Sequence, residues 1–495
     1  MAERRVNTLR TGVPGLDEVL GGGLPELSFN LVAGGPGTGK TTLAMQILFT
    51  NATAERPGLF LTLLGETSLK LLRYQQEFEF FDTGRIGSEV HVLNLSEQVM
   101  SGTLDQVLER IVAEVDRLRP GVVAIDSFRT LARPRGEPEH PDLALERFVQ
   151  RLALHLTTWD VTSFLIGEYA EQELRNPVFT VADGILWLSQ AVDRNSVVRK
   201  LQVIKMRGMA PMPGLHTSRI TDKGVQVFPR IPERTASPRA GDGPRLSTGI
   251  AGLDEMMGGG IQRGDSVVLA GPTGSGKTTF AAQFVAAGLR QGEAAVIAVF
   301  EEHPEQFLGR AKVLGIDFGE AIRRDKLRVI YLRPLDLSVD ETLQEIREAV
   351  EQTGATRVVI DSISGFEMAL APTFREDFRE SLYRLAGTLT GLGVTIYSTV
   401  EVVESPNGFL FTGYRVSFLT DVVLSQRYVE IEGELRKVFL VVKMRGSGHS
   451  SEFRLYEITP DGVLLGESLG DYDGITTGVP VRRLRSQPPG GTGRG

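Results

Sequence analysis

The sequence predicts an α/β protein with two tandem P-loop domains, each a mostly parallel sheet with helices on both faces and a β-rich C-terminal segment. The phosphate-loop pattern GxxxxGK[ST] occurs twice, at Gly34–Thr41 and Gly271–Thr278, and Lys277 follows Lys40 by 237 residues. The stretch before each loop repeats at the same interval. After each loop, short apolar runs alternate with segments of helical spacing. A long internal repeat in 495 residues favours two domains.

Four regions follow from this pattern. The first domain spans residues 1–228, a linker spans 229–244, the second domain spans 245–465, and a flexible tail spans 466–495. The linker reads PRIPERTASPRAGDGP, and its proline, glycine and charged residues are typical of an inter-domain connection. The tail ends in LRSQPPGGTGRG, which offers little apolar surface to bury.

Composition narrows the class of protein. A formal net charge of -8 argues against a chain-wide attraction to nucleic acid or to anionic membranes. The absence of cysteine excludes disulfides, thiolate catalysis and Cys-ligated zinc. The N-terminus MAERRVNTLR lacks the apolar core of a secretory signal, and no apolar run approaches the roughly 18–20 residues that span a bilayer. We therefore expect a cytoplasmic chain with no membrane or nucleic-acid partner.

Each domain begins with the same sequence pattern. Thr11–Gly23, TGVPGLDEVLGGG, returns as Thr248–Gly260, TGIAGLDEMMGGG. Each copy leads into an apolar strand, Ser28–Ala33 or Ser266–Ala270, and that strand leads into a phosphate loop. A helix is expected to begin at the lysine of each loop, because backbone N–H groups at a helix N-terminus bind phosphate.

The loops predict two nucleotide sites for ATP with Mg²⁺. The lysine of each loop would reach the β- and γ-phosphates, and the hydroxyl of Thr41 or Thr278 would reach Mg²⁺. The residues expected to contact nucleotide are Gly35, Gly37, Thr38, Gly39, Lys40, Thr41, Thr42, Thr273, Gly274, Ser275, Gly276, Lys277, Thr278 and Thr279.

The second strand of each domain, Leu59–Leu64 or Ala294–Phe300, leads to acidic residues. These are Glu66 in the first domain and Glu301 with Glu302 in the second. Ligand-binding groups gather at the carboxyl ends of parallel strands, so these carboxylates should face the phosphate loops. They are candidates for orienting or deprotonating the attacking water, and the alternative is an acid in the first turn of a helix.

The third strand of each domain ends in aspartate. Val122–Asp126 and Val358–Asp361 read VVAID and VVID, and serine follows each. An apolar strand that ends in Asp, placed after a phosphate loop, is typical of the carboxylate that holds Mg²⁺, here Asp126 and Asp361. Further strands are expected at Thr162–Ile166, Gly184–Ser189, Val394–Thr399 and Thr420–Ser425.

Each domain closes with the tetrapeptide KMRG, at Lys205–Gly208 and at Lys443–Gly446. A repeated basic pair is consistent with a solvated strand end. It is equally consistent with cations that reach the γ-phosphate of a neighbouring subunit, as an arginine finger does. Spacing leaves the two interpretations open.

Together these motifs resemble the KaiC family of circadian-clock ATPases and autokinases, within the RecA-like superfamily. The resemblance covers residues 8–465, and YVEIEGE at Tyr428–Glu434, which precedes the second KMRG, adds to it. It implies a double-ring homohexamer with ATP bound between subunits. It also implies a slow ATPase in the first domain that drives assembly, and an autokinase and autophosphatase in the second.

The same resemblance implies contacts to a neighbour's nucleotide. They fall on Lys205, Met206, Arg207, Lys443, Met444, Arg445, Ser447 and His449. The family's paired glutamates correspond to Gly65 and Glu66 in the first domain, so one acid is missing there, and Met209 and Pro211 replace polar contacts. We therefore expect the second nucleotide site to be the better preserved.

The family's adjacent Ser-Thr phosphoacceptors fall on Ser417 and Phe418, and a third hydroxyl falls on Thr412. Phe418 cannot accept phosphate, so we expect single-site phosphorylation at Ser417, with an ordinary solvated serine as the alternative. The C-terminal tail is short and unlike the family's KaiA-binding tail, so KaiA is not an expected partner. A KaiB-like or two-component signalling partner fits the resemblance.

Two other functions stay open. A RecA-like nucleic-acid motor would use basic loops with aromatic residues, which the acidic balance disfavours. A scaffold that nucleotide assembles without turnover would fit the missing acid at Gly65.

Overall fold

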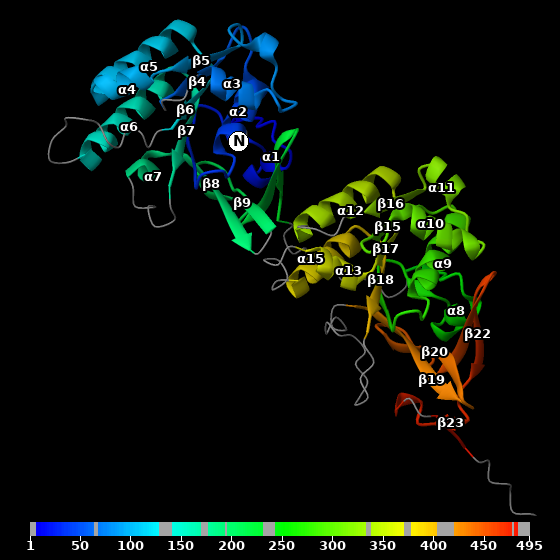
Figure 1. Cartoon of the computed structure of the whole chain (residues 1–495). Coiled ribbons are helices and arrows are strands. Elements are labelled where there is room, and N and C mark those ends of the chain that lie inside the picture. Colours follow the sequence, from blue (N-terminus) through cyan, green and yellow to red (C-terminus); the bar gives the residue numbers. More distant parts are fainter. Residues whose placement is uncertain are drawn as a thin grey trace, which may run out of the picture. The chain divides into compact units, whose positions relative to one another are not determined.

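The computed structural model describes residues 6–63, 68–127, 141–169, 177–193, 196–230, 243–332, 338–370, 378–402, 420–477 and 480–483. The chain forms two compact units, residues 1–230 and 231–495 (Figure 1). Each unit contains a nine-stranded, mostly parallel sheet. The predicted fold class, two tandem RecA-like domains, is confirmed.

In the first unit the strand order is β11-β10-β9-β8-β3-β7-β6-β4-β5, with β8 to β5 parallel and β9 to β11 antiparallel. The strands are β1 Thr8–Leu9, β2 Leu24–Pro25, β3 Phe29–Gly34, β4 Gly58–Thr62, β5 Val90–Asn94, β6 Val122–Asp126, β7 Thr162–Glu168, β8 Gly184–Asp193, β9 Ser196–Met206, β10 His216–Thr221 and β11 Gly224–Phe228. The helices are α1 Leu16–Leu20, α2 Lys40–Asn51, α3 Ser68–Gln75, the 3₁₀ turn Thr83–Arg85, α4 Ser96–Ser101, α5 Leu104–Leu118, α6 Pro141–Thr158 and α7 Pro177–Val181.

The second unit repeats this order as β16-β15-β17-β18-β14-β19-β20-β21-β22. Its strands are β12 Arg245–Leu246, β13 Ile261–Gln262, β14 Ser266–Gly271, β15 Ala295–Val299, β16 Leu327–Tyr331, β17 Arg357–Asp361, β18 Thr395–Glu401, β19 Val422–Ile431, β20 Glu434–Met444, β21 Arg454–Thr459, β22 Gly462–Ser468, β23 Tyr472–Asp473 and β24 Val481–Arg482. Its helices are α8 Ala251–Met256, α9 Lys277–Arg290, α10 Pro304–Val313, α11 Gly319–Arg323, α12 Val339–Thr353, α13 Ile363–Ala369, α15 Phe378–Gly391 and the 3₁₀ turn Ile475–Thr477.

Helices cover both faces of each sheet (Figure 1). In β14, Val267 and Leu269 belong to the core that contains Phe280 of α9, whereas Val268 belongs to the core that contains Leu343 of α12. A parallel strand between two helical layers must be apolar on both sides, which explains the uninterrupted apolar runs before the phosphate loops. The same two layers hold each loop at the carboxyl end of its strand.

The duplicated segment before each loop has a structural role. Asp17 accepts hydrogen bonds from the backbone N–H of Thr11 at 2.9 Å and from its hydroxyl at 2.6 Å. Asp254 accepts the same two bonds from Thr248, at 2.8 and 2.7 Å. Gly12 has φ +66°, and a Cβ there would lie 1.9 Å from Thr50 Oγ1. These aspartates therefore hold a tight turn against the helix that follows the loop.

The predicted flexible tail begins too early. Strand β22 continues to Ser468, and Leu469 and Ile475 are buried against Val429 of β19 and Val438 of β20. These apolar residues precede the polar stretch LRSQPPGGTGRG from which the tail was predicted, and they give the segment a small core. Residues 484–495 lie outside the described part of the chain.

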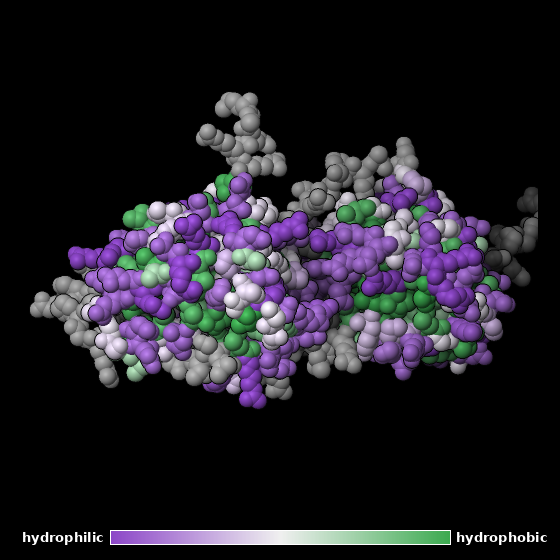
Figure 2. Space-filling model, turned by 90° about the horizontal axis from the view of Figure 1, so that it is seen from above, coloured by the Kyte–Doolittle hydropathy of each residue, from purple (hydrophilic) through white to green (hydrophobic). Residues whose placement is uncertain are grey.

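Hydrophilic residues cover much of the face drawn in Figure 2, and hydrophobic residues form scattered patches among them. Exposed apolar side chains include Val192 and Val197 in the β8–β9 hairpin and Leu435 in the β19–β20 hairpin. Within the described ranges, every helix is too short or too polar to cross a membrane.

Candidate functional site

The second phosphate loop joins β14 to α9 and is supported by the antiparallel strands. Ser275 Oγ donates to Gln426 Oε1 at 2.8 Å, and the Tyr456 hydroxyl donates to the Ser275 carbonyl at 2.7 Å. Gly276 has φ +97°, and a Cβ there would lie 2.2 Å from Ile458 Cδ1. The loop therefore needs glycine at this position, both for its backbone conformation and for the approach of β21.

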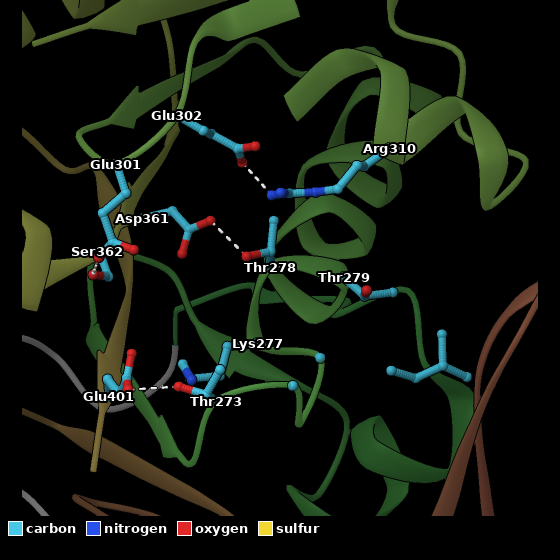
Figure 3. Close-up of a pocket in the computed structure, with 13 residues that line it drawn as sticks. Thr273, Lys277, Thr278, Thr279, Glu301, Glu302, Arg310, Asp361, Ser362 and Glu401 are labelled. Carbon is cyan, nitrogen blue, oxygen red and sulfur yellow. Dashed lines mark hydrogen bonds and ion pairs between the residues drawn. The ribbon is translucent and has the colours of Figure 1, made fainter. Parts of the chain in front are cut away.

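The loop opens on a cavity of about 560 Å³ (Figure 3). Acidic, hydroxyl and basic side chains from three neighbouring strand ends and from α10 face it. Its lining residues are Thr273, Gly274, Gly276, Lys277, Thr278, Thr279, Glu301, Glu302, Arg310, Asp361, Ser362, Glu401 and Ile458. The structure thus brings the predicted loop residues other than the buried Ser275, both predicted acids and the predicted Mg²⁺ aspartate of the second unit to one place.

Lys277 lies folded over its own loop. Its Nζ donates to the carbonyls of Gly271 at 3.0 Å and Pro272 at 2.9 Å. Burial lowers the pKa of Lys277, and the charges of Glu401, Asp361 and Glu301 oppose that shift, Glu401 most strongly. The ammonium group is therefore surrounded by oxygen acceptors that an anionic ligand could replace.

Asp361 binds two hydroxyl groups. Thr278 Oγ1 donates to Asp361 Oδ2 at 2.8 Å, and Thr399 Oγ1 of β18 donates to Asp361 Oδ1. A hydroxyl and a carboxylate side by side at the end of a phosphate loop are hard oxygen donors of the kind Mg²⁺ prefers. The donors present therefore fit the predicted metal.

The two acids of the second unit have different partners. Ser362 Oγ donates to Glu301 Oε1, whereas Glu302 forms an ion pair with Arg310 of α10 (Figure 3). Burial raises the pKa of Glu302, and the Arg310 charge opposes that shift. Sequence reasoning missed both partners. Ser362 follows the predicted Mg²⁺ aspartate directly, but Arg310 carries no signal beyond its place on the helix after the acids.

The first loop repeats the central contacts. Lys40 Nζ donates to the Gly35 carbonyl at 2.6 Å, and Thr41 Oγ1 donates to Asp126 Oδ2 at 2.6 Å. Burial lowers the pKa of Lys40, while the charges of Glu168 and Asp126 oppose that shift. The predicted lysine, threonine and aspartate of the first unit therefore also come together.

Strand register bears on the predicted acid Glu66. Thr62 pairs with Asp126 in the first unit, as Val299 pairs with Asp361 in the second. Counted from these pairs, the positions of Glu301 and Glu302 fall on Leu64 and Gly65, and Glu66 stands one residue later. Residues 64–67 lie outside the described part of the chain, so the role of Glu66 stays a prediction.

The KMRG segments lie far from their own loops. Met206 pairs with Gly184 at the start of β8, whereas Leu188, four residues further on, pairs with Gly34 of the loop. At about 3.3 Å per residue, this places the end of β9 roughly 13 Å along the sheet from the loop. In the second unit Met444 pairs with Val422 in the same way.

The basic side chains at these strand ends have backbone and carboxylate partners. Lys205 Nζ donates to the Ala182 carbonyl at 2.5 Å, and Lys443 Nζ donates to the Thr420 carbonyl at 2.8 Å. Arg207 pairs with Asp183 at 3.0 Å and Arg445 with Asp421 at 3.8 Å, yet both arginine side chains are more than half exposed.

Met206 and Met444 stay predicted contacts to a neighbour's nucleotide, and the structure gives the position of their side chains in their own units. Both side chains are buried in the hydrophobic cores, because these residues face the helices that follow the loops. His449 Nδ1 lies 3.1 Å from the Ser450 carbonyl, and Ser447 is half-buried. The predicted phosphoacceptors Ser417 and Thr412 lie outside the described residues.

Sequence reasoning also missed one acid in each unit. Glu168 pairs in register with Gly34, and Glu401 pairs with Gly271, so each ends the strand beside its phosphate-loop strand. Each of these strands ends in Glu in the sequence, but the sequence does not show which strand lies beside the phosphate-loop strand.

Comparison with known proteins shows which family the sequence matches. The family model "ATPase: KaiC" matches residues 9–231 and 246–469. The circadian clock oscillator protein KaiC of Rippkaea orientalis is 30% identical over 494 residues, covering 96% of this chain and 92% of the relative. KaiC 1 of a Synechocystis species is 30% identical over 500 residues, with the same coverage of both chains. The KaiC of Synechococcus elongatus is 29% identical over 488 residues, also with that coverage. The chain belongs to the KaiC family of ATPases.

Proposed function

We propose that this KaiC-like ATPase binds ATP with Mg²⁺ in both units and hydrolyses it in the second. The observation that carries the proposal is the convergence of Lys277, the Thr278–Asp361 pair and two glutamates on one cavity. A phosphate loop without an acid binds nucleotide, whereas the added carboxylates provide a means to activate water.

Each group in the cavity has a role in this chemistry. Lys277 would leave the Gly271 and Pro272 carbonyls and contact the β- and γ-phosphates. Thr278 and Asp361 would hold Mg²⁺, which when bound neutralises charge on the phosphates. Glu301 or Glu302 would accept the proton of the attacking water as its oxygen bonds to the γ-phosphorus and the bond to the β-phosphate oxygen breaks. Arg310 would hold Glu302 in place.

We further propose a homohexamer in which ATP lies between subunits. The support is the position of Lys205 with Arg207, and of Lys443 with Arg445, at the opposite end of the sheet from their own loops. Such cations cannot contact the nucleotide of their own unit, but a ring would bring them to a neighbour's. The exposed hairpin residues Val192, Val197 and Leu435 offer apolar surface for such contacts.

The kinase activity of the second unit is a separate proposal. Ser417 would receive the γ-phosphate of a neighbouring subunit, with Thr412 as a second acceptor and Glu301 or Glu302 as the base. The support is the family membership and the acids and hydroxyls that line the cavity around Lys277. A KaiB-like or two-component partner and a role in circadian timing follow from the same membership, as proposals.

Turnover by site-directed variants tests the hydrolysis. Lys277→Ala should abolish most phosphate release, Lys40→Ala should leave most of it, and Glu301→Gln and Glu302→Gln compared singly should identify the base. Equal turnover by wild type and a Lys40→Ala/Lys277→Ala double variant, with rings still formed, would favour the scaffold. Turnover that rises several-fold with single-stranded DNA would favour the nucleic-acid motor.

Assembly and phosphorylation need their own measurements. Size by light scattering should correspond to a hexamer with ATP and to smaller species with ADP. Mass spectrometry after incubation with ATP and Mg²⁺ should find phosphate on Ser417, and this phosphate should be missing in Lys277→Ala. Unmodified Ser417 and Thr412 in wild type would exclude the kinase activity.

A further inference from the structure

Both units place a glutamate at the same point of the sheet. Glu168 ends β7 opposite Gly34, and Glu401 ends β18 opposite Gly271, the first glycine of each phosphate loop. The two positions are equivalent by strand register, although the sequences around them, LIGEY and STVEV, differ. A carboxylate at this point therefore accompanies both nucleotide sites.

In the second unit the side chain of Glu401 turns toward the loop. Thr273 Oγ1 donates to Glu401 Oε1 at 2.5 Å, and both residues line the cavity that contains Lys277 (Figure 3). Among the carboxylates near Lys277, Glu401 exerts the strongest attraction on its ammonium group. In the first unit, Glu168 is the carboxylate that attracts the ammonium group of Lys40 most strongly. Pro36 stands where the second loop has Thr273, so the hydroxyl contact belongs to the second unit.

This charge bears on which nucleotide the loop prefers. The loop lysine contacts the β- and γ-phosphates, so a triphosphate brings more negative charge to this end of the loop than a diphosphate does. A carboxylate beside the same lysine repels that added charge and competes with it for the ammonium group. Both effects weaken the binding of a triphosphate more than the binding of a diphosphate.

We propose that Glu401 and Glu168 are specificity-determining residues that lower the preference of their sites for ATP over ADP. The inference rests on the proposed nucleotide binding and goes beyond it, because it assigns these acids neither to water activation nor to the metal. A site that is weakened toward ATP exchanges nucleotide more evenly, so the ATP/ADP ratio decides its occupancy.

The test compares the full-length protein with a Glu168→Gln/Glu401→Gln double variant, which changes both sites at once. Glutamine keeps the shape and can still accept the Thr273 hydrogen bond, so the charge alone is removed. Dissociation constants for Mg²⁺–AMP-PNP and Mg²⁺–ADP are measured by calorimetry at low and high salt. A Glu467→Gln variant, altered on exposed β22, shows what the loss of one surface carboxylate away from the loops does to the same constants.

The ratio of the ADP to the AMP-PNP dissociation constant should rise about fivefold in the double variant, the effect of one partly screened charge. This difference should shrink in high salt, and Glu467→Gln should match wild type. This inference alone is overturned if wild type binds both nucleotides and the double variant has the same ratio of dissociation constants. The same holds if the double variant binds both nucleotides more tightly by an equal factor. Wild type that binds neither overturns the proposed nucleotide binding, and this inference with it.

Discussion

Replacing Thr399 with valine should weaken Mg²⁺ binding in the second site. Thr399 is fully buried on β18, and its hydroxyl donates to the Oδ1 atom of Asp361, whose Oδ2 atom accepts from Thr278. Valine has nearly the same shape, so the core around β18 should survive. The substitution removes one hydrogen bond to a charged group, so Asp361 is held less firmly, by Thr278 without Thr399.

The magnitude follows from the kind of bond that is lost. A hydrogen bond to a charged group contributes about 1.5–3 kcal/mol, and loss of a partner that orients a metal ligand typically costs about 10–100-fold in metal affinity. These ranges agree, because each tenfold change corresponds to about 1.4 kcal/mol. The Mg²⁺ concentration that half-saturates ATP turnover should therefore rise about 10–100-fold in Thr399→Val, measured in a Lys40→Ala background to isolate the second site.

Thr399→Ser is the matched control, since it keeps the hydroxyl, and it should remain within about threefold of the parent protein. The reasoning would be refuted if Thr399→Val kept the parent's Mg²⁺ dependence while the thermal unfolding of both proteins coincided. A loss of turnover that excess Mg²⁺ did not restore would also count against it, because the defect would then lie outside metal binding.

Three further predictions concern stability. Arg357→Met should lower the free energy of unfolding of the second unit by about 3–5 kcal/mol in calorimetry, because it leaves buried partners of Arg357 such as the Phe284 carbonyl (2.7 Å) unpaired. Unchanged unfolding would contradict this. Gly12→Ala should destabilise the first unit by more than about 1 kcal/mol, since its φ of +66° and the Thr50 side chain both exclude a Cβ; a second-unit transition that shifts instead would count against it. Burial raises the pKa of Glu293, but hydrogen bonds from Arg357 and Thr356 and the Arg357 charge together hold this pKa below its ordinary value. The Glu293–Arg357 pair therefore stabilises the fold at pH values above the pKa of Glu293 in the unfolded chain, and this stabilisation is lost as the pH falls through its lower pKa in the folded chain. In an acid titration of unfolding free energy, Arg357→Met should not show this loss.

The loops, the strands that lead to them and the aspartates that pair with Thr41 and Thr278 could be predicted from sequence, because each depends on residues close together in the chain or on a repeated motif. Glu401 and Arg310 could not, because their place depends on which strand or helix lies beside the loop. Arg357 was missed for another reason. A basic residue at the start of a strand usually faces solvent, and its burial depends on Glu293 and on the Phe284 ring, 4.5 Å from the guanidinium carbon.

The two sites differ at matched positions of their sheets. Thr399 binds Asp361 in the second unit, whereas Ile166 at the equivalent register has no hydroxyl to offer Asp126. Where the second unit has Glu301 and Glu302, the count from the paired strands reaches Leu64 and Gly65 in the first. The missing hydroxyl affects a group that would orient metal, and Glu66, one residue beyond the counted positions, stays the predicted acid of the first site, while the lysine and threonine that would bind phosphate remain. We therefore expect the first site to bind nucleotide but to hydrolyse it slowly. Slow hydrolysis suits a site whose bound nucleotide holds subunits together.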